Sequence, residues 1–324
     1  MLQAGLALAM LGSAPAAPGQ PAPAALPRVV FIAAASAGTI AGRVDAFRAG
    51  LKGLGHVEGS TILVDYLFAG EKLDLIPALV ADAMRRKPDV IVSAGPSITR
   101  ALRAATGTVP IVMAFDPDPV GAGFVASLAQ PGGNVTGLSS VGAQMGSKQL
   151  ELLKQVMPRL RRATVIGNSG EPGNAPASQT LARDAKRLGV ELTFADVRSP
   201  ADIEPAFATA LQSGSQAVLV LSSPMVTFHA ARFAEQSLRQ RLPAVFPYPD
   251  AVEAGGLMHY GVSMADLFRR AAGYVDRILR GAKPGELPVE QPSRFDLVLN
   301  LKAAQRLGIA VPADVLARAD RIID

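Results

Sequence analysis

Hydrophobic and polar positions follow two rhythms along the chain from Arg28 onward. Short, continuous runs of apolar and β-branched residues predict buried strands, as in 28–35. Longer stretches with apolar residues at three- and four-residue spacing predict helices, as in 41–55, which ends in glycine. This order continues with predicted strands at 61–68, 89–95 and 110–115 and predicted helices at 73–86 and 97–105. Strands that are apolar on both faces, alternating with helices, predict a parallel sheet covered on each side.

The same rhythm begins again after 134–140. Helices are predicted at 148–158, 177–189, 200–214 and 227–240, and strands at 162–168, 190–197, 217–223 and 243–248. The sequence therefore predicts an α/β protein with two doubly wound parallel-sheet lobes, joined near 138–141.

Composition limits the classes of function. The 324 residues are 49% hydrophobic and 18% charged, which is ordinary for a globular protein of two domains. The net charge is +5, but Lys and Arg are scattered and form no basic stripe, so we expect no nucleic-acid partner. Cysteine is absent, which excludes disulfides, thiolate catalysis and a cysteine-based zinc site.

Residues 1–27 differ from the rest of the chain. A short apolar core is followed by Ala- and Pro-rich sequence, and the small residues at 13–17 resemble a signal-peptidase site. The apolar core is too short to span a bilayer. A signal peptide begins with a positively charged region, but no Lys or Arg precedes Arg28 here. The segment is thus either a signal peptide or a disordered leader. We expect export, with a soluble mature protein.

Open parallel sheets bind ligands beyond the carboxyl ends of their strands. The predicted strand ends carry small, polar, Gly- or Pro-rich segments, and these supply the candidate ligand-binding residues. They are Ser36, Gly95, Ser97, Asp116, Pro117, Val120, Ser140, Asn168, Ser222, Ser223, Tyr248, Glu253 and Tyr260.

The chemistry of these residues suits a carboxylate-bearing organic ligand. Helices predicted to start at Ser97 and Val120 would present free amides, and the serine hydroxyls would add donors. Tyr248 and Tyr260 would flank an apolar or aromatic body, or else pack in the core or at the rim. Glu253 would accept an ammonium group, or else is a solvated loop charge.

Asp116 and Asp118 follow a predicted strand and have Pro117 between them. Their spacing splays the two side chains, so paired acid–base catalysis is not expected. Asp116 either hydrogen-bonds a ligand at the rim of the cleft or braces the turn that follows, and Asp118 is expected to be a turn or cap residue. Pro119 would fix the entry into a helix at Val120.

The motifs of the common enzyme classes are missing. The chain has three histidines, none at a predicted strand end, and no G-x-S-x-G stands at a strand-to-helix turn. There is no phosphate-loop lysine motif, no G-x-G-x-x-G after the first strand, and no ligand spacing for a metal. We expect neither catalysis, nor a metal, nor a cofactor.

Several stretches resemble one family. They are "DPVGAGFVASLAQPGGNVTGLSS", "KQLELLKQVMP", "EAGGLMHYG", "ADLFRRAAGYVDRILRGAKPGELPVEQPSRFDLVLNLKAAQRLG" and "ARADRIID". The chain from Arg28 to Asp324 is similar to the substrate-binding proteins of bacterial ABC importers that include the tryptophan/tyrosine-type uptake proteins. The resemblance implies the periplasmic-binding-protein fold, a small-molecule ligand held between two hinged lobes, and no chemistry on it. It also implies a periplasmic location and delivery to an ABC permease driven by its ATPase; we expect a monomer.

The lobes are predicted to be discontinuous in sequence. The first comprises 28–139 and 263–291, and the second 140–262 and 292–324, with crossings near 138–141, 261–263 and 288–293. Asn168-Ser169 departs from the Asn-Pro that the family often has there, so the ligand, an amino acid or an aromatic or branched acid, is not carried over by name. An alternative is the ligand-sensing module of a signalling or regulatory system. A transcription factor would need a helix-turn-helix before Arg28, where the sequence is Ala- and Pro-rich.

Overall fold

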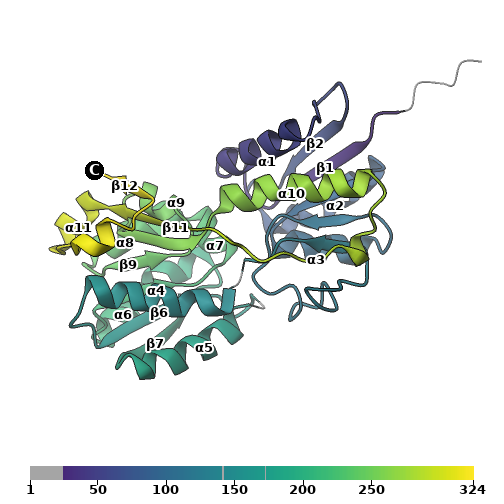
Figure 1. The fold of residues 1–324 in the computed structure, drawn as a ribbon. Coiled ribbons are helices and arrows are strands. Elements are labelled where there is room, and N and C mark those ends of the chain that lie inside the picture. Colours follow the sequence, from purple (N-terminus) through teal and green to yellow (C-terminus); the bar gives the residue numbers. More distant parts are fainter. Residues whose placement is uncertain (1–24, 141, 172) are drawn as a thin grey trace, which may run out of the picture.

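The computed structural model describes residues 25–140, 142–171 and 173–324 (Figure 1). The predicted leader lies outside the described residues except for its last three positions, and so does Val141 of the first predicted crossing. Two α/β lobes lie side by side in Figure 1, with long connecting segments between them. This is the α/β architecture that the sequence predicts.

The first lobe is built on a parallel sheet of order β2-β1-β3-β4-β5. Its strands are β1 (Arg28–Ala33), β2 (Leu63–Phe68), β3 (Val90–Ala94), β4 (Ile111–Met113) and β5 (Val135–Gly137). Its helices are α1 (Ala41–Gly53), α2 (Ile76–Arg85), α3 (Pro96–Ala105) and α10 (Met264–Leu279), with the 3₁₀ turns η1 (Leu73–Leu75) and η3 (Pro284–Glu286).

Both faces of the first sheet are covered. Phe31 of β1 packs in the cluster that contains Phe47 of α1 and Phe268 of α10, whereas Ile32 packs with residues of α2 and α3. Alternate side chains of one strand thus enter two separate layers, which requires an apolar residue at every position. Helix α10 comes late in the chain but lies against α1 (Figure 1).

The second lobe has a sheet of order β12-β11-β10-β9-β8-β6-β7, in which only the β10–β11 pair is antiparallel among the described strands. Its strands are β6 (Arg162–Gly167), β7 (Glu191–Asp196), β8 (Ala217–Val220), β9 (Ala244–Phe246), β10 (Met258–Val262), β11 (Phe295–Asn300) and β12 (Arg321–Ile323). Its helices are α4 (Gly142–Val156), α5 (Asn174–Arg187), α6 (Ile203–Gln212), α7 (Pro224–Phe228), α8 (Ala230–Arg239), α9 (Asp250–Glu253), α11 (Leu301–Leu307) and α12 (Ala313–Leu316), with η2 (Pro200–Asp202).

The chain passes between the two sheets three times: from β5 to α4, from β10 to α10, and from η3 to β11. The first and third passages run together, because Leu138 and Glu290 form a β-bridge and the Ser139 N–H donates to the Glu290 carbonyl at 2.9 Å. At the second passage the Ser263 N–H donates to the Arg294 carbonyl at 3.1 Å. Few backbone bonds therefore join the lobes along the chain.

Two predicted helices differ from the structure. No helix starts at Val120; the segment after β4 is a series of turns, and its glycines and three prolines favour turns over continuous helix. The helix predicted over 227–240 is divided at His229 into α7 and α8, and α7 begins earlier, at Pro224. Proline at the first helical position is well tolerated, which explains the earlier start.

Candidate functional site

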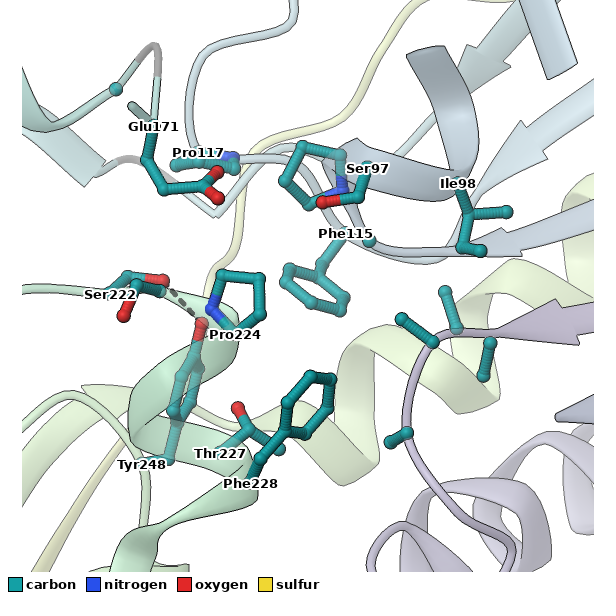
Figure 2. A pocket seen from close by; sticks show the side chains of 18 of the residues that line it. Ser97, Ile98, Phe115, Pro117, Glu171, Ser222, Pro224, Thr227, Phe228 and Tyr248 are labelled. Carbon is teal, nitrogen blue, oxygen red and sulfur yellow. Dashed lines mark hydrogen bonds between the residues drawn. The ribbon is translucent and has the colours of Figure 1, made fainter. Parts of the chain in front are cut away.

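A cavity opens between the two lobes at the carboxyl ends of their strands, where an open parallel sheet is expected to bind a ligand (Figure 2). It comprises about 850 Å³, open solvent at its mouth included. The first lobe contributes Ala33, Ala34, Ala35, Ile40, Arg43, Ala94, Gly95, Pro96, Ser97, Ile98, Phe115, Pro117 and Phe268. The second lobe contributes Glu171, Gly173, Asn174, Ala177, Leu221, Ser222, Ser223, Pro224, Thr227, Phe228 and Tyr248.

Three phenylalanines form much of the apolar wall. Phe115 follows β4, Phe268 lies in α10 and Phe228 ends α7 of the other lobe. The rings of Phe115 and Phe268 are tilted at a centroid distance of 6.1 Å, a favourable arrangement of aromatic pairs. Figure 2 shows Phe115 and Phe228 both pointing into the cavity. This part of the cavity suits an apolar or aromatic group.

The start of α3 forms one polar edge of the cavity. Gly95 has φ +121°, a conformation that only glycine adopts readily, and this turns the chain sharply from β3 into α3. The buried hydroxyls of Ser93 and Thr99 each donate to the Gly95 carbonyl at 3.2 Å, which fixes the turn. The first-turn amides of a helix have no partner within it, and they carry partial positive charge. Ser97, next to this turn, lines the cavity.

Hydroxyl groups from the second lobe form the opposite edge. The hydroxyls of Ser222 and Tyr248 are hydrogen-bonded (Figure 2). The Asn174 side-chain amide donates to the carbonyls of Asn168 (3.1 Å) and Ser222 (3.2 Å), which ties the loops after β6 and β8 together. Burial raises the pKa of the Tyr248 hydroxyl, which therefore stays protonated and can donate.

Arg43 and Glu171 carry the charge at the cavity. They are the only basic and the only acidic side chain among the described lining residues. Arg43 is already paired: it forms an ion pair with Asp250 at 3.0 Å and lies over the Tyr248 ring at 5.4 Å from its centroid. Burial raises the pKa of Glu171, and the positive charge of Arg100 partly offsets this.

Asp116 stands between two lining residues but is not one of them. Its carboxyl is buried; one oxygen accepts the Asp118 N–H at 2.9 Å, and the other has no partner among the described residues. Burial, together with the nearby charge of Asp118, raises the pKa of Asp116 to about 7, against the opposing effect of that hydrogen bond. This hydrogen bond braces the turn after β4, which is one of the two roles that the sequence analysis gave for Asp116.

The predicted residues are distributed over several places. Gly95, Ser97, Pro117, Ser222, Ser223 and Tyr248 line the cavity. Ser140 lies in a smaller adjoining pocket, which shares Pro117, Ser222 and Tyr248 with it. The other predicted residues are not among the described residues that line the main cavity: Ser36, Asp116, Val120, Asn168, Glu253 and Tyr260.

Most of the predicted residues that do not line the main cavity make contacts elsewhere in the protein. The Ser36 hydroxyl bonds that of Thr39 at 2.7 Å, and the Asn168 side chain accepts the Gly170 N–H at 2.9 Å. Tyr260 stacks on Phe295 with a centroid distance of 6.2 Å. Glu253 pairs with Arg321 and lines a second cleft, which residues of both lobes form and which shares Ile40 and Arg43 with the main cavity.

Sequence reasoning missed Arg43, Glu171 and the phenylalanine wall. Glu171 stands in the Gly- and Pro-rich segment after a predicted strand, so its position was a usable signal. Phe228 and Phe268 lie in helices whose apolar residues are equally typical of a core, and nothing in the sequence separates the two cases. Arg43 lies inside a predicted helix, where a single basic residue is ordinary.

Two further results concern the described part of the chain. There, no group of three or more His, Asp or Glu side chains is placed to hold a metal ion. None of its helices combines the length and the apolar character needed to cross a membrane.

Two α/β lobes with a cavity between them that both lobes line are the architecture of a solute-binding protein. The chain belongs to the ABC transporter substrate-binding protein family, whose family model matches residues 29–323. It is 25% identical over 256 residues to a protein of Clostridioides difficile (strain R20291) named tyrosine-binding protein, covering 77% of this chain and 72% of that one.

Solved structures show the same fold. A conserved domain protein from Vibrio cholerae superposes with a TM-score of 0.85 at 29% identity, covering 92% of this chain and all of that one. An ABC domain from Streptococcus pneumonia in complex with L-Trp also gives 0.85, at 24% identity and with the same coverage. A ligand-free, open substrate-binding protein of Clostridium difficile gives 0.70 at 20% identity, covering 92% and 99%.

Proposed function

We propose that this chain is the extracytoplasmic solute receptor of an ABC importer and binds an amino acid, or a closely related organic acid, with an apolar or aromatic side chain. The observation that carries the proposal is the two-sided cavity, with phenylalanines in its wall and a helix start and hydroxyls at its edges. The aromatic wall suits the side chain of such a ligand. Helix amides, together with Ser97, Ser222 and Ser223, suit its carboxylate. The relationship to a protein named tyrosine-binding protein supports this class of ligand.

Closure would occur by movement of the two lobes. We propose that 28–139 with 263–291 forms one body and 140–262 with 292–324 the other, moving about the three passages described above. Hinges of this kind absorb the change in a few residues at element ends. The monomeric receptor would then present its closed form to the permease, which with its ATPase moves the ligand across the membrane.

A thermal-shift screen of the purified protein tests the ligand class. Aromatic and branched amino acids, and their deaminated acids, should raise the melting temperature, with a stabilisation that grows logarithmically with concentration above Kd. Sugars and divalent metal ions serve as controls and should leave it unchanged. A shift with sugars or metal ions alone contradicts the proposal.

Transport is tested separately in cells. Uptake of the radiolabelled ligand should fall when the gene is deleted and return on complementation, and the protein should fractionate with the periplasm. A regulatory module would instead leave uptake by the existing importer unchanged. Recovery of unaltered ligand after prolonged incubation checks that binding involves no turnover.

A further inference from the structure

Glu171 differs from Arg43, the other charged side chain among the described lining residues, because its carboxylate has no hydrogen bond or ion pair with the described residues. It is half-buried beside the apolar wall. Figure 2 shows the carboxylate pointing across the rim of the cavity toward the side of the first lobe that carries Pro117 and Ser97. A carboxylate removed from water without a partner is costly, and that cost falls when a cation binds.

The loop that carries Glu171 is held by other side chains. The Ser169 N–H and hydroxyl donate to Asp196 at 2.8 and 2.7 Å, and the Gly170 N–H donates to Asn168. Asn174 bonds back to the Asn168 carbonyl. The Glu171 carboxylate takes part in none of these bonds, so a role in bracing the loop does not account for it.

The basic groups nearby do not neutralise Glu171 directly. Arg43, the one basic side chain among the described lining residues, is occupied by Asp250 and Tyr248. Arg100 is exposed on α3 and acts on Glu171 only through its charge, without a direct ion pair. The cavity therefore carries one unpaired negative charge, at its rim and next to the polar edge formed by the start of α3.

We infer that Glu171 binds the ammonium group of the ligand and thereby selects amino acids over the corresponding deaminated acids. This rests on the proposed function, which requires a carboxylate-bearing ligand but leaves the amine open. The ligand would span the rim, with its ammonium at Glu171, its carboxylate toward the start of α3, and its side chain against Phe115 and Phe228. Glu253, for which the sequence suggested this role, is about half exposed and pairs with Arg321.

The test uses Glu171→Gln, which keeps the size of the side chain and removes its charge, with Glu253→Gln as the matched control. Calorimetry compares three probes of one shape: L-phenylalanine, 3-phenylpropionate and 2-phenylethylamine. The wild type should bind phenylalanine about ten- to a hundredfold more tightly than phenylpropionate, since a charge-assisted hydrogen bond is worth that factor. Glu171→Gln should remove that preference by weakening phenylalanine and leaving phenylpropionate unchanged. Glu253→Gln should change neither.

The three probes separate failure of this inference from failure of the proposed function. If Glu171→Gln leaves the preference intact, or weakens phenylalanine and phenylpropionate equally, the inference is overturned while the proposed function stands. If phenylethylamine binds and depends on Glu171, but neither acid binds, the carboxylate ligand is wrong and the cation site is supported. If the wild type binds none of the three at millimolar concentration, the inference about Glu171 and the proposed function are both overturned for aromatic ligands. The same test is then made for branched ligands with leucine, 4-methylpentanoate and isopentylamine.

Discussion

Asp116 is a buried carboxyl with one bonded and one unpartnered oxygen, and it lies where the first passage between the lobes begins. Its backbone N–H donates to the Leu138 carbonyl at 3.1 Å, and its own carbonyl accepts the Ser140 N–H at 2.7 Å. The side chain is thus surrounded by a fixed backbone and cannot turn toward water without disturbing the passage. Its ionisation is therefore a matter of stability more than of recognition.

We predict that Asp116→Asn stabilises the protein at high pH. The pKa of Asp116 is raised from 3.8 to about 7 in the folded protein, so the folded state holds a proton that the unfolded state releases. The free energy of unfolding that this proton contributes is full below pH 4 and is lost as pH rises toward 7 and above. Asn resembles the protonated acid and lacks this loss.

Urea denaturation of both proteins at pH 5 and pH 8 measures the effect. Asp116→Asn should exceed the wild-type free energy of unfolding by about 1–2 kcal/mol at pH 5 and by roughly 3–4 kcal/mol at pH 8, because the wild type loses about 1.4 kcal/mol per pH unit between the two pKa values. Because other titrating groups are common to both proteins, they cancel in the difference. A difference that is the same at both pH values would show that Asp116 titrates normally. Ligand affinity should change less than about twofold, since the side chain does not line the cavity.

How far single residues can be predicted depends on what fixes the side chain. Ser97, Pro117, Ser222 and Tyr248 follow strands directly, so the sheet places them at the cavity and their position in sequence is enough. Glu253 also comes soon after a strand, but it is the last residue of the short α9 and pairs there with Arg321. A partner so distant in sequence is invisible until the chain folds.

At the scale of elements, the turn from β3 into α3 determines the polar edge of the cavity. Gly95 is the residue before the helix, and its backbone angles, φ +121° and ψ 161°, lie in a region that residues with a Cβ almost never occupy. A Cβ there would also stand 3.4 Å from the Phe115 ring, at the edge of normal contact. Conformation, more than space, makes glycine necessary.

We predict that Gly95→Ala lowers the free energy of unfolding by about 1–3 kcal/mol, the cost of one strained residue. Ligand affinity should fall as well, because the strain displaces the first turn of α3. Chemical denaturation followed by circular dichroism, with calorimetry, gives both quantities. Gly53→Ala is the control: Gly53 ends α1, has ordinary angles and open space around it, and alanine there should be neutral or slightly stabilising. Equal stability of the two variants would contradict this account.

The order of elements was largely predictable because buried parallel strands have continuous apolar runs and the helices between them have a different period. The residues at which strands end could not be predicted in this way. The run 110–115 forms a strand only over Ile111–Met113, since pairing with β5 ends where the chain turns away to form the passage between the lobes. Phe115 is freed from the sheet by this early end and enters the cavity. Tertiary pairing, which no local pattern encodes, decides such ends.

For the whole molecule, the structure has the two lobes in contact across the cavity. Arg43 of α1 reaches over to Asp250 at the start of α9, and Phe228 of the second lobe packs partly in a cluster of first-lobe residues. Pro117 lies against Gly173 at the rim, where a Cβ on the glycine would be 3.3 Å from the proline ring. These contacts can exist only when the lobes are close together, and all of them would be lost if the lobes moved apart.

The Arg43–Asp250 pair is the most specific of these contacts, and we predict that it sets the balance between open and closed states. Arg43 is buried, is bonded to Asp250 at 3.0 Å and lies over the Tyr248 ring, so its charge is shielded from solvent. Asp250→Asn keeps the shape but removes the charge pairing, and an ion pair with partly buried members is worth more than an exposed one. The open state should then gain population.

In Asp250→Asn the fraction of molecules in the closed state should fall about three- to thirtyfold, and ligand affinity should fall by the same factor. This effect is expected although Asp250 does not line the cavity. Small-angle scattering of the ligand-free protein should show a larger radius of gyration than the wild type, and saturating ligand should restore the wild-type value. Glu151→Gln is the matched control, because the Lys148–Glu151 pair at 3.0 Å lies within α4 and joins two residues of the same lobe. If Asp250→Asn weakens binding while both scattering curves match the wild type, the pair acts on the pocket itself, through Arg43 and Tyr248, and the lobes close without its help.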